Sequence, residues 1–153
     1  MQIEDQNLSE MLEANVRCGM IAVVGRANAG KSTLINAMLE EKVSIVSPIA
    51  QTTRNVIRGI LNDERGQLVF LDTPGIHKPM SELGKIMNSL ARSSIDGVDV
   101  VLLVVDVSEA PRAEDEGWMR RLLFEYAAVV VVLNKQDSKA RHDGAHQKMW
   151  SAI

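Results

Sequence analysis

The stretch VVGRANAGKST (Val23–Thr33) decides the fold of this chain. It contains the pattern G-x-x-x-x-G-K-[ST], at Gly25–Ser32, with an apolar segment of strand length before it and helix formers after it. A glycine-rich loop between a strand and a helix lets backbone N–H groups surround a phosphate at the positive end of the helix. The stretch therefore predicts a phosphate-binding loop in a strand–loop–helix unit.

Segments of strand and helix character alternate along the rest of the chain. The predicted strands are Met20–Gly25, Asn55–Leu61, Gln67–Leu71, Val98–Val107 and Ala127–Leu133. Helices are predicted over Ser32–Glu40, around Leu83–Leu90, from Pro111, and after Asp137. This alternation predicts an α/β, three-layer P-loop NTPase fold with a mostly parallel sheet. The last two strands are almost entirely apolar, and we expect both to be buried.

Composition excludes several classes of protein. The chain has 153 residues, a net charge of −3 and one Cys, which allow one domain without an internal disulfide. It lacks the basic stripe of a nucleic-acid binder, an apolar run of membrane-spanning length and the charge pattern of a signal peptide, so we expect a cytoplasmic protein. Cys18 is expected to be a small core residue. His142 and His146 are four apart without a third ligand, and we expect both to face solvent.

The residues of the loop and of a later Asp indicate how phosphates and a metal would be held. Lys31 can reach the outer phosphates as a mobile charge, and the Ser32 hydroxyl can ligate Mg²⁺. D-x-x-G occurs twice, and its first copy, Asp63–Gly66, is expected to be a hairpin turn. The second copy starts at Asp72, directly after a predicted strand, where the carboxylate can hold Mg²⁺ through water. The Gly75 N–H at its end can sense the γ-phosphate.

A second loop indicates which base is bound. Asn134-Lys135-Gln136-Asp137 follows a predicted strand, and the Asp137 carboxylate can accept two hydrogen bonds from guanine. Adenine would present a lone pair to the same carboxylate, which leaves a polar group unpaired at a cost of roughly 1–3 kcal/mol. GTP is therefore favoured over ATP. Asn134 is expected to contact either the phosphate loop or the base, and the Lys135 stem to lie along the base.

A polar segment between the two phosphate-binding motifs, SPIAQTTRN, is expected to contain a switch residue. A Thr in it can complete the Mg²⁺ shell when GTP is bound and release it after hydrolysis. Thr53 is the favoured candidate and Thr52 the alternative.

With these motifs the chain resembles the Era family of GTPases, within the translation-factor class. The resemblance rests on GRANAGKST, QTTRN, DTPGIHKP and NKQD, which stand in the family's order over roughly Arg17 to Asp137. It implies an N-terminal extension at 1–16 and an Era-type G domain at 17–153. It further implies GTP or GDP and Mg²⁺ as ligands, 16S ribosomal RNA and the small ribosomal subunit as partners, and by analogy alone a peripheral membrane association.

Two positions bear on the mechanism that the resemblance implies. Ile76 stands where many regulatory GTPases have a water-orienting Gln. Asn28 matches the Asn with which several relatives hold a K⁺ ion beside the phosphates, so hydrolysis is expected to be faster in K⁺ than in Na⁺. Ala27 replaces the family's usual Pro.

The resemblance also implies that the chain stops before the family's last strand and helix and before its RNA-binding KH domain. The alternative to an active GTPase is thus a truncated guanine-nucleotide-binding module with negligible turnover and no RNA binding of its own. Lys31, Thr53 and Gly75 are the predicted catalytic residues, and Ser32, Thr53 and Asp72 the predicted Mg²⁺ ligands. The predicted nucleotide-binding residues are Gly25, Arg26, Ala27, Asn28, Ala29, Gly30, Lys31, Ser32, Thr33, Asp72, Thr73, Pro74, Gly75, Asn134, Lys135 and Asp137.

Overall fold

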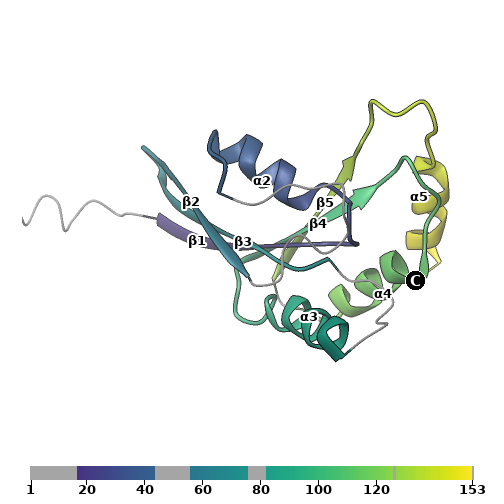
Figure 1. The fold of residues 1–153 in the computed structure, drawn as a ribbon, viewed down its shortest axis with the longest axis horizontal. Coiled ribbons are helices and arrows are strands. Elements are labelled where there is room, and N and C mark those ends of the chain that lie inside the picture. Colours follow the sequence, from purple (N-terminus) through teal and green to yellow (C-terminus); the bar gives the residue numbers. More distant parts are fainter. Residues whose placement is uncertain (1–16, 44–55, 76–81, 126, 153) are drawn as a thin grey trace, which may run out of the picture.

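The fold is a five-stranded sheet with helices on both faces (Figure 1), seen in a computed structural model that describes residues 17–43, 56–75, 82–125 and 127–152. In chain order the elements are β1 (Arg17–Val24), α2 (Lys31–Leu39), β2 (Ile57–Asp63), β3 (Gly66–Asp72), α3 (Glu82–Ser93), β4 (Val100–Asp106), α4 (Ala113–Leu122), β5 (Ala128–Asn134) and α5 (Asp143–Ser151). The predicted alternation of strands and helices is confirmed.

The strands follow the order β2-β3-β1-β4-β5, with β2 antiparallel to β3 and every other neighbouring pair parallel. The mostly parallel sheet predicted from the sequence is therefore confirmed. The four parallel strands end at the same edge of the sheet, and in such sheets ligands bind beyond that edge. The predicted phosphate loop, Asp72 and Asn134 all lie at these strand ends.

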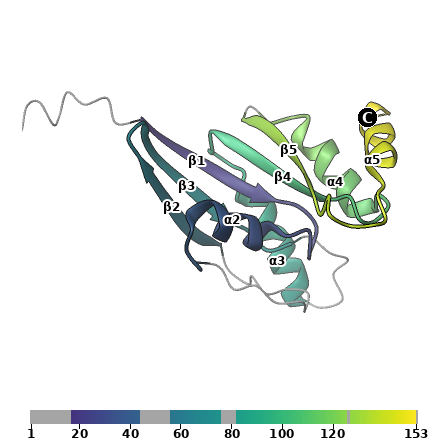
Figure 2. The ribbon, with the colours of Figure 1, turned by 90° about the horizontal axis from the view of Figure 1, so that it is seen from above.

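The core has two layers because side chains alternate across each strand. Ala22 and Val24 pack with Trp118 on the face covered by α3 and α4, whereas Val23 packs with Ile35 of α2 on the other face. Figures 1 and 2 show α2 alone on its face and α3 with α4 on the opposite one. The strands that carry the predicted site therefore lie in a sheet packed between helices on both faces.

The hairpin between β2 and β3 confirms the prediction for the first D-x-x-G copy. Asp63 accepts a hydrogen bond from the backbone N–H of Arg65 at 2.6 Å, and the strands pair from Asp63 opposite Gly66 onward. Gly66 has φ +143°, and a Cβ there would lie 2.0 Å from the carbonyl oxygen of Arg17 in β1. A turn of this shape next to β1 requires glycine.

Three predictions about burial and one about a helix start are wrong. Strand β5, expected to be buried, is exposed over its first three residues, because it is the edge strand and α2 packs over β2 and β3 instead. Cys18 is exposed, since β1 begins at Arg17 and its first residues extend past the helices (Figure 2). His146 is fully buried between α5 and the loop after β4. Helix α4 begins after Arg112, not at Pro111.

Among the described residues, no helix has the length and apolar character needed to cross a bilayer.

Candidate nucleotide-binding site

The phosphate loop, residues 25–30, joins the end of β1 to the start of α2. Gly25 has φ +144°, and a Cβ there would lie 2.3 Å from the carbonyl oxygen of Val104 on the neighbouring strand. Gly30 has φ +96°, and a Cβ there would lie 2.2 Å from Nδ2 of Asn134. Both glycines are thus required by neighbouring strands and loops as well as by the turn itself.

Helix α2 begins without a side-chain cap. Gly30 is its N-cap, no side chain hydrogen-bonds to the cap position, and its first turn contains no acidic residue. The N–H groups of a helix's first turn and the positive end of its macrodipole favour an anion at this place. A phosphate group is the natural ligand for such a helix end.

Lys31 lies folded over its own loop. Its side chain is buried, and Nζ donates hydrogen bonds to the carbonyl oxygens of Gly25 at 3.3 Å and Arg26 at 3.0 Å. Burial lowers the pKa of Lys31 to about 8, although the nearby charge of Asp72 opposes the shift. A second anion at the loop would therefore raise this pKa again, and the ammonium group is placed to receive one.

Asp72 and Ser32 meet at the end of β3, next to the phosphate loop. The Ser32 hydroxyl donates a hydrogen bond of 2.6 Å to Oδ2 of Asp72, whose side chain is buried. A hydroxyl and one carboxylate, with phosphate oxygens and water, are the donors that Mg²⁺ prefers. The side chains present therefore fit the predicted Mg²⁺ ligands Ser32 and Asp72.

The residues after Asp72 pack against the phosphate loop. Thr73 is fully buried and its hydroxyl donates to the carbonyl oxygen of Val23 at 2.8 Å, so this side chain joins β3 to β1. Gly75 lies so close to the phosphate loop that a Cβ there would be 2.4 Å from Cα of Ala27 and 3.0 Å from Nζ of Lys31. The structure thus brings Gly75 close to Lys31, and the γ-phosphate contact that the sequence predicts for each of them stays a prediction.

The Asn134–Asp137 loop lies beside the phosphate loop. Nδ2 of Asn134 donates a hydrogen bond of 2.8 Å to the carbonyl oxygen of Ala29. Of the two partners that the sequence left open for Asn134, this structure shows the phosphate loop. Lys135 adopts the left-handed conformation with φ +62°, and Asp137 is exposed. Asp137 is thus accessible to a ligand beside the loop.

Sequence reasoning missed an acidic cluster behind the phosphate loop, formed by Asp106, Glu109 and Asp115. Arg26 inserts into it, with its guanidinium 2.5 Å from Glu109, 3.4 Å from Asp115 and 3.8 Å from Asp106. The Arg26 side chain is 7% exposed, so it contacts the cluster and not the phosphate cradle. The one signal in the sequence is that Asp106 ends an apolar strand, as Asp72 and Asn134 do.

Three predicted positions lie outside the described residues: Thr53, its alternative Thr52, and Ile76. Of the other predicted residues, Ala27, Asn28, Ala29, Thr33 and Pro74 lie in or beside the loops just described. Asn28 is exposed in the phosphate loop, with φ +62°.

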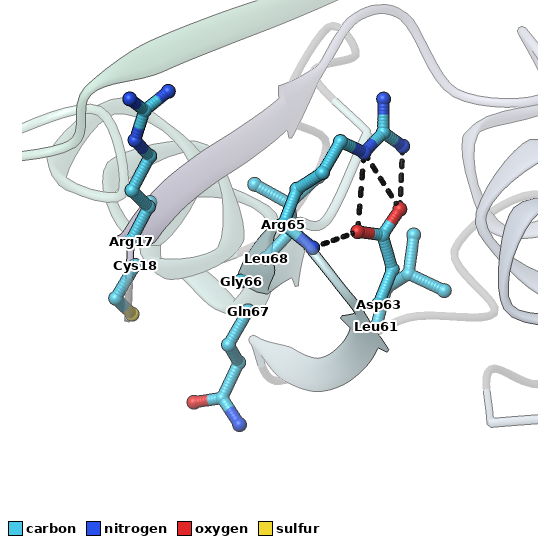
Figure 3. Close-up of a pocket in the computed structure, with 9 residues that line it drawn as sticks. Arg17, Cys18, Leu61, Asp63, Arg65, Gly66, Gln67 and Leu68 are labelled. Carbon is cyan, nitrogen blue, oxygen red and sulfur yellow. Dashed lines mark hydrogen bonds and ion pairs between the residues drawn. The ribbon is translucent and has the colours of Figure 1, made fainter. Parts of the chain in front are cut away.

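A separate pocket of about 370 Å³ lies at the opposite edge of the sheet, and Figure 3 shows the residues that line it. It is lined by the start of β1 and by the β2–β3 hairpin, and two of its lining residues, Arg65 and Asp63, form an ion pair. Cys18 lies on its wall. Because this edge holds the amino ends of β1 and β3, the pocket is not the nucleotide site.

The arrangement at the carboxyl edge is that of a P-loop guanine-nucleotide-binding domain. Residues 20–135 match the profile of a family described as 50S ribosome-binding GTPase. The chain therefore belongs to that family, and its G domain is of the Era type.

Two curated relatives illustrate the similarity. GTPase Era of Heliobacterium modesticaldum is 46% identical over 129 residues, which are 84% of this chain and 43% of the relative. GTPase Era of Geobacter sp. (strain M21) is 48% identical over 128 residues, with coverages of 83% and 43%. The chain thus spans less than half the length of these relatives.

Two solved structures share the fold. One is Era in complex with MgGDPNP and nucleotides 1506–1542 of 16S ribosomal RNA, with a TM-score of 0.79 and 36% identity over 90% of this chain and 48% of that one. The other is a point variant of Aquifex aeolicus Era bound to GDP·AlF4⁻, with a TM-score of 0.76 and 37% identity over 90% and 47% of the two chains.

Proposed function

We propose that this chain binds GTP and GDP together with Mg²⁺ and hydrolyses GTP to GDP and phosphate. The observation that carries the proposal is the hydrogen bond from Asn134 to Ala29, which holds the Asn134–Asp137 loop, predicted to select guanine, beside the phosphate loop. Because the two loops are adjacent, one nucleotide can place its phosphates on the first and present its base to Asp137 on the second. The solved Era structures with MgGDPNP and GDP·AlF4⁻ support the same ligands.

In the proposed complex the first turn of α2 and Lys31 bind the phosphates, and Ser32, Asp72 and Thr53 hold Mg²⁺. The metal, when bound, would supply positive charge that offsets the negative charge of the phosphates. Water attacks the γ-phosphorus as the bond to the bridging oxygen breaks, and Lys31 and the Gly75 N–H stabilise the charge that develops. A K⁺ ion held by Asn28 would add further positive charge beside the phosphates.

Guanine selection is tested with Asp137→Asn. In xanthine a carbonyl oxygen replaces the exocyclic amino group of guanine, so an amide can donate where the carboxylate accepted. We expect the variant to bind GDP at least tenfold more weakly and to bind xanthosine diphosphate more tightly than the native chain does. Asp96→Asn, an isosteric change at an exposed residue, is the matched control. Equal GDP and ADP binding by the native chain would reject guanine recognition.

Turnover is tested separately from binding. Single-turnover hydrolysis of GTP is measured with Mg²⁺ and with EDTA, in K⁺ and in Na⁺. Metal-dependent release of phosphate supports the GTPase proposal. GTP binding without any release supports the alternative, a guanine-nucleotide-binding module with negligible turnover.

We further propose that the whole protein acts in assembly of the small ribosomal subunit, with this domain as its nucleotide-dependent part. The support is the similarity to Era proteins and the solved Era structure that contains a 16S ribosomal RNA segment. Co-sedimentation of the GTP-loaded and GDP-loaded chain with small subunits tests whether this domain contributes to the interaction.

A further inference from the structure

Asp106 lies between the two loops that would hold the nucleotide. It is the last residue of β4, the strand between β1 and β5, and it stands opposite Asn134 in the β4–β5 register. The phosphate loop follows β1 and the Asn134–Asp137 loop follows β5. A side chain at this position can therefore contact both loops at once, although neither loop is its neighbour in the sequence.

The Asp106 side chain contacts a residue of each loop. Its Oδ2 accepts a hydrogen bond from Nζ of Lys135 at 2.7 Å and lies 3.8 Å from the guanidinium of Arg26. Its Oδ1 accepts from the backbone N–H of Ser108 at 3.0 Å and from the Ser108 hydroxyl at 2.5 Å. The side chain is only 4% exposed.

The charge on Asp106 is maintained despite this burial. Burial would raise the pKa of the carboxyl, but the hydrogen bonds from Lys135 and Ser108, with the charge of Lys135, hold it below its ordinary value. Asp106 is therefore ionised at neutral pH, and a charge-assisted hydrogen bond fixes the end of the Lys135 side chain.

Lys135 needs such an anchor because its backbone is unfavourable. Its φ of +62° lies in the left-handed region, which lysine seldom adopts. Strained backbone persists only where surrounding contacts hold it. Asp137, the residue that would read the guanine edge, is two positions further along the same loop.

We propose that Asp106 is a positioning residue for guanine selection: by holding Lys135 it sets the place of Asp137, and by facing Arg26 it fixes that place relative to the phosphate loop. The inference rests on the proposed function, since it concerns the same site. Asp106 would touch neither base nor phosphate.

The experiment compares GDP with inosine diphosphate (IDP), which differs from GDP only in lacking the exocyclic amino group. Loss of one hydrogen bond to the Asp137 carboxylate should make the native chain prefer GDP by about tenfold to a hundredfold. In Asp106→Asn the amide keeps the shape but loses the charge that holds Lys135. We expect the GDP-to-IDP affinity ratio, measured by calorimetry, to fall by about fivefold or more. Asp96→Asn should leave the ratio unchanged.

The ratio separates positioning from a purely structural role. A variant that is merely less folded loses affinity for both nucleotides equally, so an unchanged ratio in a folded Asp106→Asn chain overturns the inference. If that variant does not fold, Ser108→Ala removes only one donor to Asp106, and the ratio should fall by about twofold. An unchanged GDP-to-IDP ratio in Ser108→Ala would also overturn the inference. A native chain that binds no GDP rejects the proposed function itself, whereas a native preference for GDP that survives the substitutions rejects this inference alone.

Discussion

Replacement of Arg26 by Met should destabilise the domain, because it leaves buried carboxylates without their cation. The three acids of the cluster are affected unequally. Asp106 keeps Lys135 at 2.7 Å, and Glu109, whose side chain is 46% exposed, keeps Arg112 at 2.8 Å. Asp115 is 6% exposed and retains, among the contacts described, the backbone N–H of Arg112 at 2.9 Å. The cost is therefore concentrated at Asp115.

Breaking a buried ion pair by removing one partner costs about 3–5 kcal/mol. Since two of the three acids keep a cation and the Met side chain still packs, we expect the lower end, about 3 kcal/mol. For a chain of this size that loss corresponds to a fall in Tm of about 6–12 °C. The free energy of unfolding is measured by urea denaturation followed by circular dichroism. Arg65→Met, at an ion pair whose Arg side chain is 90% exposed, is the matched control and should leave Tm unchanged.

A second substitution tests the physical cause. Asp115→Asn removes the stranded charge but keeps an oxygen that can accept from the backbone N–H of Arg112, so the cap of α4 is preserved. The double variant Arg26→Met/Asp115→Asn should therefore be more stable than Arg26→Met alone. If Arg26→Met costs less than about 1 kcal/mol, or if Asp115→Asn recovers nothing, the destabilisation does not come from an unpaired buried charge.

Four further predictions concern the nucleotide loops. Because burial lowers the pKa of Lys31 to about 8 from 10.5, the folded chain binds fewer protons than the unfolded chain between these values, so stability of the nucleotide-free domain should rise with pH over that interval. Lys31→Met should accordingly raise Tm at pH 7, because it removes roughly 3 kcal/mol of the cost of burying the charged lysine. The same variant should no longer bind GDP. A Tm below that of the native chain would contradict the prediction. Gly75→Ala places a Cβ 2.4 Å from Cα of Ala27, and should weaken GTP binding at least tenfold by displacing the phosphate loop, as competition titration would show. Asn28→Gly keeps the backbone at φ +62° accessible but removes the side-chain oxygen, so it should erase any excess of the hydrolysis rate in K⁺ over Na⁺; a persistent excess places the ion elsewhere.

The sequence predicted the elements and the loops well because their signals are local. Gly25, Gly30 and Lys31 are fixed by the spacing of one motif, and the buried strand before Asp106 is read from six consecutive apolar residues. Asn134 was assigned to the correct loop, but only the structure distinguished the phosphate loop from the base as its contact. Burial of individual side chains was harder to predict, and β5, Cys18 and His146 are the errors.

The sequence by itself determined the α/β fold and the phosphate-loop motif and predicted a guanine-selecting loop, because each depends on residues close together along the chain. Only the tertiary structure decided that Arg26 faces three acids instead of the phosphate cradle, and that Asp106 is shared between the two loops. Arg26 is at least 80 positions away in the sequence from each acid that it faces, and Lys135 is 29 positions away from Asp106. These contacts exist because parallel pairing places β4 between β1 and β5, an order of strands that no local pattern specifies.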